Sequence, residues 1–212
     1  MATAPSEELI ILIDPERCMG CRSCSIACAV EHSATKSIYT SPAETPKPIP
    51  RIFVLPVAIY NVPMRCQHCK DAPCMAVCPT GAISRSDEGF VVLNPEKCIG
   101  CLMCALACPF GHPRFDSETK TVVKCDFCIN RLRKGQQPAC VEACPTGALR
   151  FGTLDELMRE VAKEKAEQLI SGLGAAPGKV VVVPGARKVE VAKPSPVKLS
   201  DVVSMYSRVR WT

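Results

Sequence analysis

The run Cys98-Ile-Gly-Cys101-Leu-Met-Cys104-Ala-Leu-Ala-Cys108 has the residue types and spacing best suited to chemistry in this chain. Its first three thiols are two residues apart, so a tight turn can bring them to one face of a cubic iron–sulfur cluster. The fourth stands before Pro109 and points away, which leaves it free to bind a second cluster. Soft thiolates at this spacing select iron–sulfur clusters or zinc. The run therefore indicates a metal centre.

Variants of this run occur four times and use all 16 cysteines of the chain. The middle spacing grows to four residues in the second run and eleven in the fourth, and both of these end in Cys-Pro-Thr-Gly-Ala. Zinc ribbons use two separated C-x₂-C pairs, a pattern that only the fourth run could match. The sequence thus predicts four [4Fe–4S] clusters, with structural zinc as the alternative.

The net charge of the chain depends on what the cysteines bind. The formal charge is +5 with every cysteine neutral, but sixteen thiolates on four oxidised clusters bring it to about −3. A basic composition is therefore poor evidence for a nucleic-acid partner, and we predict none. No run of ~18 apolar residues occurs and residues 1–8 lack the pattern of a signal peptide, so we expect no membrane span and a reducing, cytoplasmic location.

Short elements should position the cysteines. We expect a strand at Ile10–Ile13, a short helix that carries Cys28, and a hairpin in which Ala82–Arg85 and Phe90–Leu93 flank a turn. Residues 29–65 contain several prolines and should form a loop and edge-strand insertion, with extended pieces at 51–56 and 57–60. The basic stretch 131–135 reads as a solvated loop, with a partner contact as the alternative.

The cysteines stop after residue 150. Thr153 and Glu156 form a capping box that predicts a helix over 153–171, ended by Gly172. Beyond it we expect a strand at 179–183, a linker at 194–196 and an apolar tail at 199–211 that packs on its own domain.

An internal repeat joins the runs. Ile13-Asp14-Pro15-Glu16-Arg17-Cys18 returns 80 residues later as Leu93-Asn94-Pro95-Glu96-Lys97-Cys98. Residues 66–115 hold, in order, a cysteine run, Pro-Thr-Gly-Ala, a hairpin, Asn-Pro-Glu-Lys and another cysteine run. That order resembles a complete bacterial two-cluster ferredoxin. One departure stands out, because Ala29 replaces the proline expected after Cys28.

On these motifs, residues 9–150 resemble the four-cluster ferredoxin-like electron-transfer subunits of molybdopterin oxidoreductases, formate-linked hydrogenases and CO dehydrogenases. Residues 18–32 are most similar in wording to the CO-dehydrogenase-associated and hydrogenase-associated members. The resemblance implies an α+β fold of two nested ferredoxin-like units with short two-stranded sheets and helices. It implies an outer unit from 9–65 with 116–152, an inner unit at 66–115, and a C-terminal helix and strand extension at 153–212.

The resemblance also implies how the ligands are shared between clusters, numbered here 1 to 4. Cluster 1 would take Cys18, Cys21, Cys24 and Cys144; cluster 2 would take Cys66, Cys69, Cys74 and Cys108; cluster 3 would take Cys98, Cys101, Cys104 and Cys78; cluster 4 would take Cys125, Cys128, Cys140 and Cys28. The competing interpretation pairs the first run with the second and the third with the fourth. The self-contained order of 66–115 favours nesting.

We expect no catalytic residues. None of His32, His68 and His112 stands with a plausible nucleophile and acid, and Gly172-Leu-Gly174 follows a helix rather than a strand, unlike a dinucleotide-binding motif. His68 could tune a cluster by hydrogen bonding, although a solvent-exposed loop position is the simpler interpretation.

The predicted function is electron relay from a catalytic redox partner to a downstream acceptor protein such as a hydrogenase. The first choice of partner from the sequence is a CO dehydrogenase. The alternatives are a formate dehydrogenase or another molybdopterin oxidoreductase, a freely diffusing polyferredoxin, and a zinc-organised interaction module.

Overall fold

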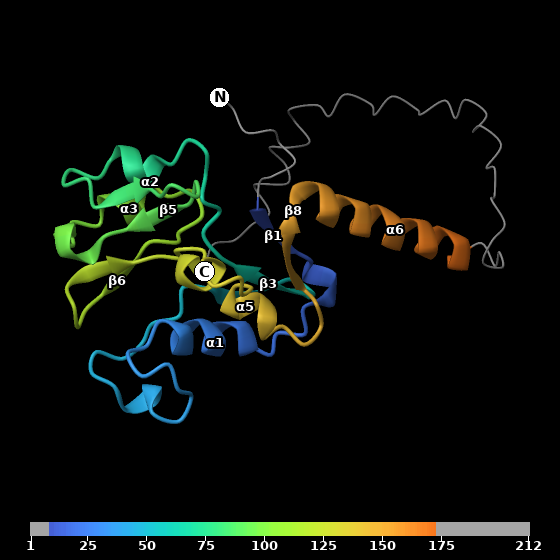
Figure 1. The fold of residues 1–212 in the computed structure, drawn as a ribbon, viewed down its shortest axis with the longest axis horizontal. Helices are drawn as coiled ribbons and strands as arrows, with labels where there is room; N and C mark the ends of the chain where they lie inside the picture. The colour runs from blue at the N-terminus through green and yellow to red at the C-terminus, as the bar shows by residue number, and fades with distance from the viewer. Residues whose placement is uncertain (1–8, 173–212) are drawn as a thin grey trace, which may run out of the picture. The chain divides into compact units, whose positions relative to one another are not determined.

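The computed structural model describes residues 9–172 (Figure 1). Two compact units divide the chain, residues 1–163 and residues 164–212, and only the end of one helix is described in the second. The described residues form four two-stranded antiparallel sheets, together with short helices. This confirms the predicted α+β class with short two-stranded sheets. No described helix is long and apolar enough to cross a membrane.

The elements are short and follow one another closely. The strands are β1 (Leu9–Ile13), β2 (Phe53–Val57), β3 (Tyr60–Met64), β4 (Ile83–Arg85), β5 (Val91–Leu93), β6 (Arg114–Asp116), β7 (Thr121–Val123) and β8 (Leu149–Thr153). The α-helices are α1 (Ser23–Glu31), α2 (Pro73–Ala76), α3 (Met103–Ala107), α4 (Ile129–Leu132), α5 (Ala139–Glu142) and α6 (Leu154–Gly172). Short 3₁₀ turns are η2 (Pro15–Arg17), η3 (Ser41–Ala43) and η4 (Pro95–Lys97).

Strand pairing nests one ferredoxin-like unit inside another. β1, which precedes the first cysteine run, pairs with β8, which follows the fourth, from Leu9 opposite Thr153 to Ile13 opposite Leu149 (Figure 1). Between the second and third runs, β4 and β5 form the expected hairpin. α1 packs against α5 and α2 against α3. The outer unit is thus closed by the two ends of the cysteine-bearing segment, while the exact domain boundaries remain a prediction.

The internal sequence repeat forms the same turn twice. Asp14 and Asn94 each accept a hydrogen bond from the backbone N–H two residues on, at 3.1 and 2.9 Å, and a proline begins each following 3₁₀ turn. Such caps satisfy donors that the short turn leaves free. Each turn delivers the chain to the first cysteine of a run, so the repeated residues position ligands.

The insertion at 29–65 forms a hairpin as well as loops. β2 and β3 pair with each other, from Phe53 opposite Met64 to Val57 opposite Tyr60. The expected second extended piece at 57–60 is wrong, because the chain turns there, with Ala58 at φ +52°. Prolines are tolerated in both strands because a two-stranded sheet consists of edges only.

The apolar core is thin and contains the ligands themselves. One cluster of buried side chains combines Cys24, Cys28 and Cys140 with seven residues: Ile11, Ile52, Val54, Phe90, Phe127, Ile129 and Leu149. The other combines Cys74 and Cys104 with Ala72, Ile83, Val91 and Val122. So small an apolar core must draw stability from whatever the cysteines bind.

The capping box at the start of α6 is present. The backbone N–H of Thr153 donates to the Glu156 carboxylate at 3.0 Å, and the Glu156 N–H donates to the Thr153 hydroxyl at 3.3 Å. The helix runs to Gly172, as expected to within one residue. The strand, linker and tail expected beyond it lie outside the described residues.

We expect Gly100→Ala to destabilise the protein more than Gly111→Ala. Both glycines have positive φ, +68° and +62°, so both substitutions bring backbone strain of roughly 1–2 kcal/mol. A Cβ on Gly100 would stand 2.4 Å from the Lys120 carbonyl oxygen, whereas a Cβ on Gly111 meets nothing within 4 Å. Thermal unfolding of both variants measures the difference, and equal midpoints would show that the loop around Gly100 moves aside freely.

Candidate metal centres

The sixteen cysteine sulfurs gather in four groups, and each group draws on two runs. Three groups line cavities: Cys18, Cys21, Cys24 and Cys144; Cys66, Cys69, Cys74 and Cys108; Cys78, Cys98, Cys101 and Cys104. In the fourth, Cys140 interacts electrostatically with Cys125, Cys128 and Cys28. All sixteen thiols are free of disulfides. These are the four sets named above, and Cys28 lies with Cys125 and Cys128 rather than with the second run.

The local fold brings three thiols of the first and third runs together. Arg22 and Leu102, each between the second and third cysteine of its run, adopt left-handed conformations at φ 61° and 65° and precede α1 and α3. This reversal turns the chain into a helix whose first turn carries the third cysteine. Cys28, one turn further along α1, belongs to the next group.

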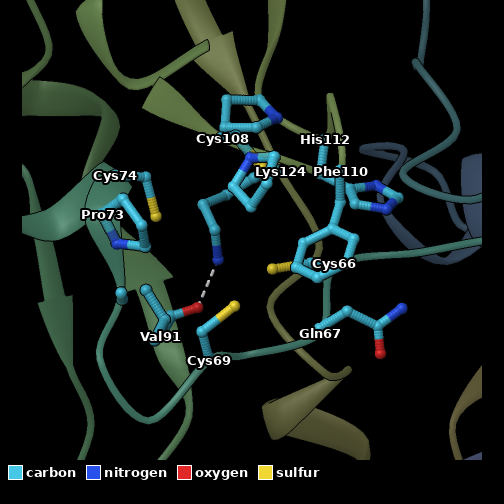
Figure 2. Close-up of a pocket in the computed structure, with 13 residues that line it drawn as sticks. Cys66, Gln67, Cys69, Pro73, Cys74, Val91, Cys108, Phe110, His112 and Lys124 are labelled. Atoms are coloured by element: carbon cyan, nitrogen blue, oxygen red, sulfur yellow. Dashed lines mark hydrogen bonds between the residues drawn. The ribbon is translucent and has the colours of Figure 1, made fainter. Parts of the chain in front are cut away.

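The cavity of the second group shows how different elements contribute to one site (Figure 2). Cys66 and Cys69 lie in the loop after β3, Cys74 lies on α2 and Cys108 follows α3. His112 also lines this cavity, is 4% exposed, and has no protein partner for either ring nitrogen among the described residues. Burial and the charge of Arg114 lower its pKa to about 4, so the ring is neutral and carries one N–H donor. The sulfides of an iron–sulfur cluster would give this donor an acceptor.

The charges of the fourth group also fit a cluster. Burial and the neighbouring Cys125 raise the pKa of Cys28 to about 12, and burial raises the pKa of Cys128 to about 12. Burial and the other three sulfurs raise the pKa of Cys140 far above its ordinary value. Four such thiols can all ionise only around a cationic core, and a [4Fe–4S] core carries a charge of about +2. The donor set therefore suits this group.

Comparisons with known proteins decide the family. Residues 57–154 match the 4Fe-4S dicluster domain, and residues 15–31 match a 4Fe-4S binding domain. The chain is 40% identical over 152 residues to the thiosulfate reductase electron transfer subunit PhsB of Salmonella typhi, covering 71% of this chain and 79% of that protein. The chain is a member of the iron–sulfur electron-transfer subunits of molybdopterin oxidoreductases.

Two further relatives agree. A protein of Escherichia coli named for its anaerobic dimethyl sulfoxide reductase is 37% identical over 153 residues, covering 70% of this chain and 75% of that protein. The iron–sulfur subunit of the nitrate-inducible formate dehydrogenase of Escherichia coli is 35% identical over 176 residues, covering 76% of this chain and 60% of that protein. The cofactors of the electron-transfer subunit are accordingly four [4Fe–4S] clusters, and the subunit is not a catalytic one.

Several donors in the electron-transfer subunit point at ligand sulfurs. The backbone N–H of Arg51 donates to Cys28 Sγ at 3.2 Å, and that of Phe127 donates to Cys125 Sγ at 3.4 Å. The hydroxyls of Thr80 and Thr146 lie 3.7 and 3.9 Å from the sulfurs two residues before them. Such hydrogen bonds stabilise anionic sulfur and raise cluster potential. The repeated Cys-Pro-Thr signalled the threonines, but nothing in the sequence signalled Arg51.

A buried polar network holds α1 against the loop of the fourth run. His32 Nδ1 lies 2.7 Å from the Cys28 carbonyl oxygen, and Nε2 lies 3.0 Å from the Asp126 carboxylate. Asp126 also pairs with Arg51 at 2.9 Å and accepts the Cys128 N–H at 2.9 Å. Although burial opposes ionisation, these contacts hold the pKa of Asp126 well below its ordinary value. The network fixes the chain around two ligands of the fourth group.

We expect Asp126→Asn to cost about 2–4 kcal/mol of stability, because it leaves the Arg51 guanidinium partly buried without its carboxylate. Chemical denaturation measures this cost. Asp71→Asn, at an exposed position, is the control and should change little. Equal midpoints for the two variants would show that the ion pair contributes nothing net.

Two expectations from the sequence are wrong. His68 is not a solvent-exposed loop residue, because its Nδ1 accepts the Val91 N–H at 3.1 Å and its ring meets Phe90 and Phe127 edge-on. Burial and the charge of Lys124 lower the pKa of His68 to about 2. The basic stretch 131–135 is not simply solvated either, since Arg131 is 17% exposed and pairs with Glu31 at 3.0 Å and with Glu142.

Proposed function

We propose that this subunit relays electrons between a molybdopterin-containing catalytic subunit and a downstream acceptor protein. The observation that carries the proposal is the gathering of sixteen free thiols into four groups of four, each built from two runs. Relatives named for thiosulfate reductase, dimethyl sulfoxide reductase and formate dehydrogenase support a partner of the molybdopterin class. They favour this alternative over the CO dehydrogenase chosen first from the sequence.

The proposal assigns one [4Fe–4S] cluster to each group, with the ligand sets already given for clusters 1 to 4. Each cluster then takes three cysteines from one run and one from another, the nested sharing that the resemblance implies. Thiolate ligands must stay reduced while clusters assemble, so the proposal includes a reducing, cytoplasmic location.

Contacts between groups suggest the order of the clusters. Cys104 interacts with Cys74, which places clusters 3 and 2 side by side, and Cys125 interacts with Cys66, which places clusters 4 and 2 side by side. α1 carries both Cys24 of cluster 1 and Cys28 of cluster 4. The row therefore runs 3–2–4–1. The two exposed cysteines, Cys21 and Cys101, belong to the end clusters 1 and 3, where electrons would be exchanged with other proteins.

Anaerobic purification from the native host, with metal analysis of the purified complex, tests this function. We expect a brown preparation with about 16 iron atoms per chain, together with a catalytic subunit that contains molybdopterin. A nickel-containing CO dehydrogenase in its place would restore the first choice. A chain that purifies alone would favour the freely diffusing carrier, and a colourless zinc protein would refute electron relay.

A further inference from the structure

Two cations lie inside the protein without a carboxylate partner. Arg65 is 5% exposed and Lys124 is 3% exposed, and no ion pair joins either to a carboxylate within residues 9–172. Lys124 Nζ donates to the carbonyl oxygens of Val91 and Cys125, the latter at 2.8 Å. Arg65 donates to the carbonyls of Cys66 at 2.7 Å and Ile11 at 2.9 Å. Carbonyl dipoles alone do not offset the desolvation of a full charge, so negative charge must lie close by.

Lys124 lies between clusters 2 and 4. Its side chain lines the cavity of Cys66, Cys69, Cys74 and Cys108, where it extends toward Val91 (Figure 2). Its ammonium group also contacts the backbone of Cys125, a ligand assigned to cluster 4. Its positive charge acts on the Cys74 thiol.

Arg65 joins the same two clusters from another element. It directly precedes Cys66 of cluster 2 and bonds to that residue's carbonyl, while its charge acts on Cys125 and Cys140 of cluster 4. The guanidinium carbon stands 5.3 Å from the centre of the Phe127 ring, which shields it from water on that side. The negative charge that compensates both cations is then that of clusters 2 and 4.

We propose that Arg65 and Lys124 raise the reduction potentials of clusters 2 and 4, so that the central pair of the row holds electrons more readily than it would without them. The inference rests on the proposed function, because it needs clusters on these ligands. Reduction adds one electron from a neighbouring end cluster and breaks no bond. The charge of a cluster with its four thiolates changes from about −2 to −3. A fixed positive charge in a low-dielectric site stabilises the more negative state more strongly.

Both residues act through the clusters as positioning residues rather than as ligands. The arrangement gives the relay a defined profile, because an electron that arrives at either end cluster is drawn to the centre. Each central cluster accepts one electron, so the pair can store two. A purely structural role for the cations predicts a loss of stability on substitution but no selective change in two potentials.

Redox titration followed by electron paramagnetic resonance tests the proposal on the complex purified with its catalytic subunit. Lys124→Gln removes the charge and keeps an amide donor, Lys124→Arg keeps the charge, and Lys134→Gln at an exposed position is the control. In Lys124→Gln we expect the reduction equilibrium constant of two clusters to fall at least tenfold, about 59 mV for a one-electron couple. The other two clusters should not change. Lys124→Arg and Lys134→Gln should retain the wild-type potentials, and Arg65→Gln should repeat the shift of Lys124→Gln.

Unchanged potentials in Lys124→Gln with full iron content would overturn the inference, and so would an equal shift of all four clusters. If Lys124→Gln loses cluster 2, the iron falls by about four atoms and the potential of the remaining cluster 4 decides the matter. An unshifted cluster 4 would again overturn the inference. Wild-type protein without iron would refute the proposed function itself, which distinguishes the two failures.

Discussion

Replacing Cys28 and Cys140 together by alanine should remove no more iron than replacing either one alone. The two residues stand 112 positions apart in the sequence, yet Cys28 on α1 and Cys140 on α5 belong to one group of sulfurs, and the two helices pack together. If both ligate cluster 4, losing one ligand already damages that cluster, and losing the second has nothing further to remove. Each single variant should lose at most about four of about sixteen iron atoms.

The pair Cys28→Ala and Cys74→Ala is the matched control. These cysteines belong to different groups, so their iron losses should add. Linear pairing of the runs predicts the opposite, because it places Cys28 on the cluster of Cys66, Cys69 and Cys74. Iron analysis of the three single and two double variants therefore separates the two ways of sharing ligands. Additive losses for Cys28 and Cys140 would overturn the nested assignment.

Local features of this protein were predictable from the sequence. Cysteine spacing identifies cluster ligands because three of each four must converge within one turn. The Asp14 and Asn94 turns, the hairpin of β4 and β5, and the capping box of α6 depend only on neighbouring residues. Each of these features is decided within about ten residues of chain.

Features that join distant segments were missed. The clash that Gly100 avoids involves Lys120, the bond to Cys28 Sγ comes from Arg51, and Asp126 meets His32 across 94 positions. Histidine, lysine and arginine are ordinarily placed at the surface because burying their charge is costly. His68, Arg65 and Lys124 depart from that rule here, where the proposed clusters supply compensating charge and the folded chain excludes water. A sequence pattern does not contain that environment.

Removal of all iron under anaerobic, reducing conditions should abolish cooperative unfolding of the protein. The two apolar cores contain eleven buried residues other than cysteine, and five cysteines complete them. Without clusters, Arg65 and Lys124 become buried charges with carbonyl partners only. Leaving buried charges uncompensated costs several kcal/mol each, which is comparable to a total stability of about 5–15 kcal/mol.

Circular dichroism during heating measures the effect of this removal. We expect a steep thermal transition in the iron-loaded protein and a gradual loss of signal in the iron-free protein, with helix α6 contributing the largest remaining helical signal because its capping box is local. Anaerobic reconstitution with iron and sulfide is the control and should restore the transition. A cooperative transition in iron-free protein near the original temperature would show that the small apolar cores suffice, and that the buried cations are stabilised by something other than clusters 2 and 4.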